Sequence, residues 1–298
     1  MELRQLEYFV AIAELRNFSR AAERCAVAQP ALSQQVRRLE AELGAQLLVR
    51  TTRSVALTDA GAALLRNARR VLADVESARA EIDAITGLLH GRLTLGAIQF
   101  VPLLDIPRLL AGFRAAYPGV DVVLRTADNE RMLAEVRSGQ LDLAFVSFRP
   151  QVAPADLGRL PVLTEPLLAV VAAEHPLASR TSVPLADLAA HPFIELGPGS
   201  GLRSQSDHAF SAAGLERHVA LEVAGLDDML SLAALGLGLA LLPSSLLHAR
   251  QAASVRAVPL AEQPAWRAVA LVWREAEPVS PSARAFLADV RRALAEAS

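Results

Sequence analysis

Residues 17–39, NFSRAAERCAVAQPALSQQVRRL, decide the fold of the N-terminal part of the chain. The pattern predicts two short helices separated by a tight turn over residues 25–28. Asn17 or Ser19 can begin the first helix, because a short side chain with an oxygen atom accepts hydrogen bonds from the free amides at a helix start. Pro30 fits the first turn of the second helix, where a missing N–H costs nothing.

The second of these helices has an apolar stripe and a polar face. Residues at three- and four-residue spacing are expected to pack inward: Leu32, Val36, Leu39 and Leu43. Another face is expected to be exposed and to contact DNA: Gln29, Pro30, Ser33, Gln34 and Arg37. Gln29, Ser33 and Gln34 suit the edges of bases and Arg37 suits phosphate, so this face predicts a helix that enters the major groove of double-stranded DNA.

The flanking segments favour DNA binding over the alternative, a helical hairpin with an ordinary polar face. Residues 3–15 predict a preceding helix, and LLVRTTRSVALT at 47–58 predicts a two-stranded wing carrying Arg50 and Arg53. Arginines on such a ribbon can follow the phosphate backbone or reach into a minor groove. Residues 1–57 carry eight Arg against six Asp and Glu, a net charge of +2 on a chain of −2, which is the sign expected for a DNA-binding module.

A long helix is predicted next, from Thr58 as its cap to about Gly87, with Asp59 at its positive end. Apolar residues alternate steps of four and three along it without a break: Leu64, Ala68, Val71, Val75, Ala78, Ile82 and Ile85. This heptad seam predicts a homodimer or homotetramer in which two helices pair; a helix packed on its own domain is the alternative. Two recognition helices in fixed relation would suit a partly palindromic site.

From about residue 91 the pattern changes to strands alternating with helices. Strands are predicted over RLTLGAI, VDVVLRT and LDLAFVSF, with helices over IPRLLAGFRAAYP and ERMLAEVRSGQ between them. This order implies a largely parallel sheet covered on both faces. A second unit follows, with strands over LLAVVAAEHPLA, PFIEL, VALEV and GLALLP and helices over 200–214 and 227–235; the strand AVALVWRE and a helix over 282–297 then close the chain.

The N-terminal sixty residues resemble the winged helix-turn-helix of LysR-type transcriptional regulators. The matching segments are LRQLEYFVAIAE, NFSRAAERCAVAQPALSQQVRRLEAELGAQLL and VRTTRSVALTDAG, and the length and order of parts fit over the whole chain. One departure is Ala28, where the family usually has serine or threonine. A cap of that kind is worth on the order of 1 kcal/mol, so its loss would weaken the site slightly.

The resemblance implies an α/β architecture in three parts. A winged helix-turn-helix DNA-binding domain spans 1–58, a linker and dimerisation helix spans 59–88, and a periplasmic-binding-protein-like effector domain spans 89–298. The effector domain is expected to have two lobes, the first over about 91–162 and 268–298 and the second over about 163–267, with crossovers near 161–166 and 265–270. Such a regulator would bind a small-molecule effector between the lobes and, as an activator, would contact RNA polymerase.

The expected effector site lies at the carboxyl ends of strands, where two sheet edges face each other across a cleft. Its candidate residues are Ile98, Gln99, Phe100, Thr126, Asn129, Ser147, Arg149, Gly199, Ser200, Arg203 and Gly225. The GPGSG segment precedes a helix whose free amides suit an anion, and Arg149 or Arg203 could pair with a carboxylate. An anion is therefore among the expected effectors; for each arginine, the alternative is an ordinary surface residue.

Other classes of protein fit less well. The six histidines form no HExxH and have no spaced cysteine partners, so no metal site and no cofactor is expected. GPGSG is neither a Walker loop nor a GxSxG elbow, and no catalytic set converges. The single cysteine, Cys25, excludes an internal disulfide and a two-cysteine redox switch. No signal-peptide pattern opens the chain and its apolar runs are too short for a bilayer, so a cytoplasmic protein with no membrane partner is expected rather than a solute-binding protein.

Overall fold

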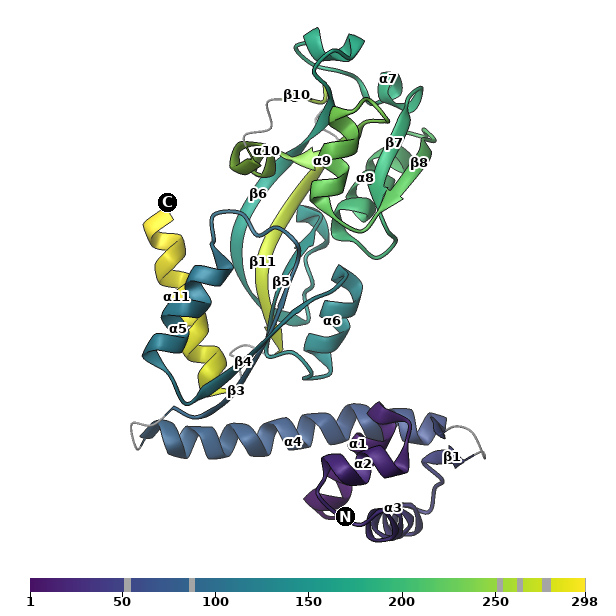
Figure 1. Cartoon of the computed structure of the whole chain (residues 1–298), viewed down its shortest axis with the longest axis vertical. Helices are drawn as coiled ribbons and strands as arrows, with labels where there is room; N and C mark the ends of the chain where they lie inside the picture. The colour runs from purple at the N-terminus through teal and green to yellow at the C-terminus, as the bar shows by residue number, and fades with distance from the viewer. Residues whose placement is uncertain (51–54, 86–88, 251–253, 262–264, 275–279, 298) are drawn as a thin grey trace.

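The computed structural model describes the chain except for residues 51–54, 86–88, 251–253, 262–264, 275–279 and 298. The side chains of Arg50, Ala73, residues 76–85 and Arg250 also lie outside the described part. A small N-terminal helical unit continues into the long helix α4, and α4 runs beside one end of a larger α/β domain (Figure 1).

The N-terminal unit has the predicted helices and wing strands. Its elements are α1 (Leu3–Leu15), α2 (Phe18–Arg24), α3 (Gln29–Leu43), β1 (Leu48–Arg50) and β2 (Val55–Leu57), with the two strands antiparallel. Asn17 caps α2 by accepting a hydrogen bond from the Arg20 amide at 3.0 Å. Leu32, Val36 and Leu39 of α3 are fully buried with Phe9 of α1. Leu43 was expected in the same stripe but is 42% exposed, because it is the last residue of α3, before Gly44 in the left-handed conformation.

Helix α4 (Asp59–Ile85) begins by packing on the unit that precedes it. Ala68 is buried in the core that α1 and α3 form, and Leu64, Leu65 and Leu72 pack against the same core. Ala68 is therefore covered by its own chain rather than by a second copy, and Leu64 is partly covered by it. Val71, by contrast, is 39% exposed. The side chains of Ala78, Ile82 and Ile85 lie outside the described residues.

The α/β domain is built on one seven-stranded sheet. Its strands are β3 (Gly91–Ala97), β4 (Val120–Thr126), β5 (Leu143–Phe148), β6 (Leu157–Ala172), β9 (Ala240–Pro243), β10 (Val255–Val258) and β11 (Trp266–Arg274). They lie in the order β10-β6-β11-β5-β3-β4, with β9 also paired to β6. The strands β3, β4 and β5, for which a parallel arrangement was expected, are parallel, whereas β6, β9, β10 and β11 join the sheet through antiparallel pairs.

Helices cover both faces of the sheet around β3, β5 and β11. On one face lie α5 (Ile106–Ala116) and α11 (Pro281–Ala297), whose Phe113 and Phe286 rings meet edge to face at 5.4 Å. On the other face lies α6 (Asn129–Arg137), whose Met132 and Val136 are fully buried. Alternate residues of β5 point to these two faces, as the pleat of a strand requires.

A separate core organises the second half of the domain. There β7 (Pro192–Leu196) and β8 (His218–Val223) form a parallel pair, surrounded by α7 (Leu185–Ala189), α8 (Gly201–Ala212), α9 (Leu226–Ala234) and α10 (Ser244–Arg250). The short 3-10 helices η1 (Pro150–Val152) and η2 (Pro176–Ser179) flank β6. Strand β6 contributes Leu157 to the first half and Leu167 to this core, so one strand serves both. The sequence did not predict β10, α7 or α10.

Candidate nucleic-acid interface and ligand cleft

Helix α3 presents a polar face to solvent. Gln29, Pro30, Gln34 and Arg37 are all exposed, as expected, and Arg38 is exposed beside them. Ala28 is the N-cap of α3 and makes no side-chain cap, so the first amides of this helix have no hydroxyl partner from that position. Two amides and two guanidinium groups within the first three turns of α3 are the donors and acceptors that the major groove of DNA accommodates.

Ser33 departs from this arrangement. Only 6% of its surface is exposed, so the expectation that α3 displays it beside Gln34 is wrong for the structure described. Position 33 adjoins Leu32 and lies one turn before Val36, both fully buried, and it therefore falls at the edge of the inward stripe. Its carbonyl oxygen accepts a hydrogen bond from Nε of Arg37 at 3.4 Å.

The wing positions are described only in part. The backbone of Arg50 pairs with Val55 between β1 and β2. The side chain of Arg50 and the whole of Arg53 lie outside the described residues. The wing is nevertheless tied to the helices, because the side chain of Glu40 in α3 accepts hydrogen bonds from the amides of Leu47 and Leu48 at 2.9 and 3.2 Å.

A cavity of about 510 Å³ lies between the two cores of the α/β domain. Its walls come from the residues after β3, β4 and β5, from the start of α8, from the segment between β8 and α9, and from β11. They are Ile98, Gln99, Phe100, Thr126, Ala127, Asp128, Asn129, Ser147, Leu196, Gly197, Pro198, Ser200, Gly201, Leu202, Glu222, Val223, Ala224, Leu226 and Arg267. The volume falls within the range of small-molecule sites, roughly 300–1,000 Å³.

Seven of the eleven expected effector-site residues line this cavity: Ile98, Gln99, Phe100, Thr126, Asn129, Ser147 and Ser200. Arg149, Gly199, Arg203 and Gly225 do not belong to its lining. Arg203 is engaged elsewhere, because its Nε donates to Oδ1 of Asp207 at 3.0 Å and its Nη1 donates to the Leu196 carbonyl at 3.2 Å. Neither arginine proposed from the sequence as an anion partner therefore faces the cavity.

The cation that does line the cavity is Arg267, on β11. Its side chain is buried, 1% exposed, and its Nε donates to Oε1 of Glu165 at 2.9 Å. Nη2 is 2.8 Å from the same oxygen but makes no hydrogen bond to any described residue. Burial lowers the pKa of the Arg267 guanidinium from its ordinary value, while the charge of Glu165 acts in the opposite direction. The buried Arg267–Glu165 ion pair thus forms part of the cavity wall.

Glu165 itself is held by the second half of the domain. Its Oε2 accepts from the Ser244 hydroxyl at 3.0 Å and from the Ser245 amide at 2.8 Å, and its Oε1 accepts from the Ser245 hydroxyl at 2.8 Å. The Phe100 ring lies 5.7 Å from the guanidinium carbon of Arg267. Neither Glu165 nor Arg267 was predicted from the sequence. The available signal was a charged residue inside each of two apolar stretches, VLTEPLL at 162–168 and WRAVALVW at 266–273.

The start of α8 approaches the end of β5 very closely. A Cβ atom on Gly201 would lie 2.2 Å from the Ser147 hydroxyl oxygen, so a larger residue would not fit without displacement. Oδ1 of Asn129 accepts from the Ser147 amide at 2.9 Å, and the Asn129 amide donates to the Gly199 carbonyl at 3.1 Å. The two sides of the cavity are therefore in direct contact at this edge.

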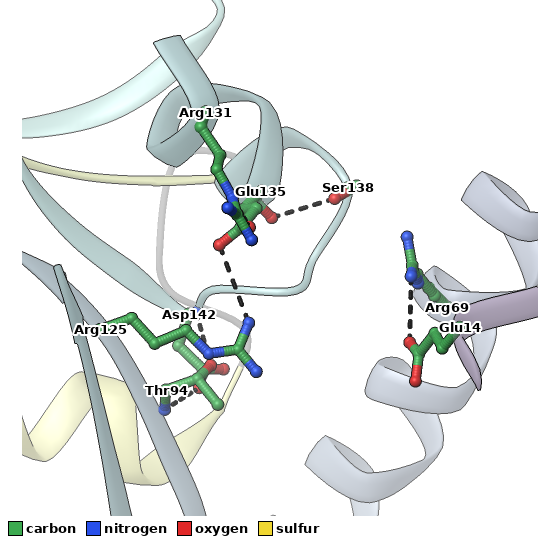
Figure 2. Close-up of polar contacts among 8 residues, drawn as sticks. All are labelled: Glu14, Arg69, Thr94, Arg125, Arg131, Glu135, Ser138 and Asp142. Atoms are coloured by element: carbon green, nitrogen blue, oxygen red, sulfur yellow. Dashed lines mark hydrogen bonds and ion pairs between the residues drawn. The ribbon is translucent and has the colours of Figure 1, made fainter. Parts of the chain in front are cut away.

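The other end of the α/β domain contacts the linker helix α4. Arg69 of α4 bonds to Glu14 of α1 at 3.0 Å, and Figure 2 shows this pair opposite the turn that contains Ser138. With its amide oxygen directed at Arg69, Gln140 of that turn accepts from Nη2 at 2.8 Å. Nearby, Asp142 accepts from the amide and the hydroxyl of Thr94 at 2.7 and 2.6 Å (Figure 2). Polar groups therefore join the DNA-binding unit to the α/β domain through α4.

Other kinds of chemistry find little support in the described residues. No group of three or more His, Cys, Asp or Glu side chains that could hold a metal ion occurs among them. Burial raises the pKa of the Cys25 thiol, which makes it a poorer nucleophile. Within the same residues, no helix combines the length and apolar character that crossing a membrane requires.

Two family models match the chain. The model described as a bacterial regulatory helix-turn-helix protein of the lysR family matches residues 3–62, and the LysR substrate binding domain matches residues 86–295. Among curated relatives, the uncharacterized HTH-type transcriptional regulator YnfL of Escherichia coli strain K12 is 36% identical over 297 residues, covering 99% of each chain. The hydrogen peroxide-inducible genes activator of Escherichia coli O157:H7 is 34% identical over 280 residues, covering 94% of this chain and 91% of that one.

A solved structure extends the likeness to the whole chain. The full-length OxyR of Pseudomonas aeruginosa, carrying a cysteine-to-aspartate substitution, aligns with a TM-score of 0.74 at 28% identity, covering 100% of this chain and 94% of that one. Both the DNA-binding unit and the cleft domain thus have counterparts in one known architecture, a helix-turn-helix followed by a periplasmic-binding-protein-like domain. The chain belongs to the LysR family of bacterial transcriptional regulators, DNA-binding proteins whose action at a promoter is modulated by a small-molecule effector.

Proposed function

We propose that the exposed face of α3 reads the sequence of a promoter site. Gln29 and Gln34 make the base contacts, and Arg37 binds phosphate, with Pro30 starting the helix at the groove. Amide side chains suit adenine bidentately, and arginine suits phosphate as well as guanine. Ser33 supports this face from the interior rather than contacting DNA itself, because it is buried. Arg50 and Arg53 of the wing are assigned to the flanking backbone or minor groove.

The cavity between the two cores is the effector site in this proposal. The observation that carries it is the cavity of about 510 Å³ between the two cores, in whose wall the buried Arg267 lies with its charge paired to Glu165. An effector with an acceptor oxygen would be favoured beside that guanidinium. Apolar walls from Ile98, Phe100 and Leu202 would bury the rest of the molecule. Because Glu165 already balances the charge of Arg267, a neutral carbonyl serves here as well as a carboxylate.

Effector sensing through cysteine chemistry is not part of this proposal. One relative is named for induction by hydrogen peroxide, and the OxyR structure concerns a replaced cysteine. In this chain the single cysteine is Cys25, at the C-terminal end of α2 in the DNA-binding unit. The proposed effector domain over 89–298 contains no thiol in its sequence, so no sulfenic acid or disulfide can form there.

The proposed assembly is a homodimer or homotetramer acting in the cytoplasm on a partly palindromic site. The exposed Val71, with the half-buried Val75, begins the part of the α4 seam that remains for a second copy. Effector binding would change how the α/β domains sit against α4, and thereby the relation between two recognition helices and the access of RNA polymerase. The effector can shift that balance only by its difference in affinity for the two states. No catalytic reaction is assigned to the chain.

A blocking substitution tests the effector site. Ser200→Phe places a ring in the cavity, whereas Ser211→Phe places the same ring on the exposed far end of α8. A thermal-shift screen of metabolites against the wild type should find compounds that raise Tm, because a ligand of the folded state stabilises it. Those shifts should persist in Ser211→Phe and disappear in Ser200→Phe. A shift that survives in both variants would place the site elsewhere.

A further inference from the structure

Gln99 joins the two sides of the cleft through its side-chain amide. The residue follows β3, and its partners lie between β8 and α9, on the other side of the cavity. Its Nε2 donates to the Ala224 carbonyl at 2.5 Å, and its Oε1 accepts from the Leu226 amide at 3.0 Å. Both ends of one carboxamide are therefore used across a gap that an effector would enter.

Gln99 supplies a hydrogen-bond acceptor that the N-terminus of α9 lacks. Its N-cap is Gly225, which has no side chain, and Leu226 is the first residue of the helix. The first amides of a helix have no partner within it and need one from outside. Gln99 provides that partner from the opposite lobe. The match is specific to glutamine: Glu has the same reach but no donor for the Ala224 carbonyl when ionised, and Ser or Thr is too short to hold both groups.

Gln99 also lies between two cavities. Gln99, Ile98, Phe100 and Thr126 line the 510 Å³ cavity of the proposed effector site and a second cavity of about 550 Å³ that extends towards Leu124 and Ala249. The Gln99 side chain is thus part of the wall between them. Although it holds two hydrogen bonds, it is exposed to solvent, so it can leave its partners without disrupting a core.

We propose that Gln99 is a latch that keeps the two lobes closed over the cleft when no effector is present. The inference rests on the proposed function, in which the cleft takes a small molecule. Entry of that molecule requires the two bonds to Ala224 and Leu226 to open. Gln99 therefore determines how easily the effector enters. It also determines which chemical group can take its place, because the Leu226 amide then needs another acceptor oxygen.

A second contact across the cleft makes the latch testable. The Asn129 amide donates to the Gly199 carbonyl at 3.1 Å, and Gln99 touches neither residue in that bond. A latch that holds the lobes together protects this distant amide as well. A side chain that merely caps α9 protects Leu226 alone. The two roles therefore predict different patterns of amide exchange.

The experiment is hydrogen–deuterium exchange on the full-length protein without effector. It compares the wild type with Gln99→Ala, Gln99→Glu and the matched control Gln151→Ala, which removes an exposed glutamine side chain from η1. Each protein is first shown to have a cooperative thermal transition. In Gln99→Ala we expect exchange to quicken by about tenfold at Leu226 and also at Asn129, since two hydrogen bonds of modest net strength are lost. In Gln99→Glu only the bond to the Ala224 carbonyl is lost, so we expect a smaller increase at both amides. Gln151→Ala should exchange as the wild type does.

Two outcomes would overturn the latch. Unchanged exchange at both amides in Gln99→Ala would show that the bonds do not hold the lobes. Faster exchange at Leu226 with no change at Asn129 would reduce Gln99 to a helix cap. Neither readout requires an effector, so the latch can stand or fall independently of the metabolite screen that tests the effector site itself.

Discussion

Arg274 at the end of β11 donates from Nη2 to Oδ1 of Asp74 in α4 at 2.9 Å. The same strand carries Arg267 in the cavity, so one element touches both the proposed effector site and the linker helix. A shift of β11 along its axis would move both Arg267 and Arg274. The ion pair therefore connects the strand that lines the cleft to the linker helix.

Removing that pair should change stability only slightly. Asp74 is about half exposed, and exposed ion pairs contribute roughly 0–1 kcal/mol. We expect Asp74→Asn to lower Tm by no more than a few degrees, and a double-mutant cycle with Arg274→Gln to give a coupling below about 1 kcal/mol. Asp59→Asn, at the start of α4, is the control. A much larger coupling would mean that the contact fixes the orientation of the two domains rather than adjusting it.

Gln34 should carry sequence preference. Gln34→Ala removes an exposed amide from α3, while Asn67→Ala removes one from an exposed position of α4. A good bidentate base contact is worth about 1–3 kcal/mol of discrimination. We therefore expect Gln34→Ala to lose about tenfold or more in the ratio of specific to nonspecific DNA binding, measured by competition binding at fixed salt. Equal ratios for the two variants would remove Gln34 from the base-reading set.

Val71 should lie in an interface between copies. It is 39% exposed in the single chain, whereas its neighbour Leu72 packs against the N-terminal core. Val71→Asp would place a charge in an apolar seam, and burial of an unpaired carboxylate is strongly unfavourable. Sedimentation velocity should show a smaller assembly for Val71→Asp than for the control Arg66→Asp, which places a carboxylate at an exposed position on the far side of α4. An unchanged assembly would assign the seam to a surface other than that of Val71.

Replacing only one residue of the Glu165–Arg267 pair should strongly destabilise the fold. Both side chains are almost fully buried, and removing one partner of such a pair destabilises a protein by about 3–5 kcal/mol. Glu165→Ala should therefore lower Tm by roughly 10 °C, since a domain of this size loses about 2–4 °C per kcal/mol. The exposed Glu174 provides the control, Glu174→Ala. In the paired variant Glu165→Leu with Arg267→Met, much of the lost stability should return; failure to recover would indicate that packing matters more than charge.

Stability should depend on pH through Glu195. Burial raises the pKa of this β7 carboxyl to about 7, although Arg217, bonded to it at 3.0 Å, acts in the opposite direction. In the unfolded chain the pKa is about 4.3. The folded state thus binds the proton more tightly, and this stabilisation is complete at low pH and is lost as pH rises from about 4.5 to about 7.

The test is the difference in Tm between the wild type and Glu195→Gln across that range. We expect the wild type to lose stability relative to Glu195→Gln as pH increases from about 4.5 to about 7. Comparison with the amide variant cancels the titration of other carboxylates. A constant difference would show that the charge of Arg217 fully offsets burial.

Local patterns were sufficient for the DNA-binding unit. Asn17, Pro30 and Gly44 mark helix ends through their own backbone chemistry, and the observed α2 and α3 begin and end beside them. The same periodicity could not identify a partner. Leu64 and Ala68 fit a heptad, yet their seam is filled by α1 of the same chain, because an apolar stripe only indicates that something covers it.

The residues of the effector cleft could be predicted only in part from their order in the sequence. Gln99, Thr126 and Ser147 lie at or near the carboxyl ends of strands, and the carboxyl ends of parallel neighbours brought them together as expected. Arg149 follows β5 and Arg203 lies in the first turn of α8, but position near a strand end does not fix the direction of a side chain. Arg267 lies within a strand that runs antiparallel to its neighbours, so its approach to the cleft depends on a sheet order that alternation of apolar residues does not encode.

The continuous strand β6 has a consequence for how the α/β domain unfolds. It pairs with β11 from Leu157 to Pro166 and with β9 and β10 from Leu167 to Ala172, so each core uses a different stretch of the same strand. Neither half retains a complete sheet if the other melts. Heat should therefore unfold the domain in one cooperative transition, and a fragment cut within β6 should fail to fold from either side. In this architecture the two halves are parts of one sheet rather than two independent domains.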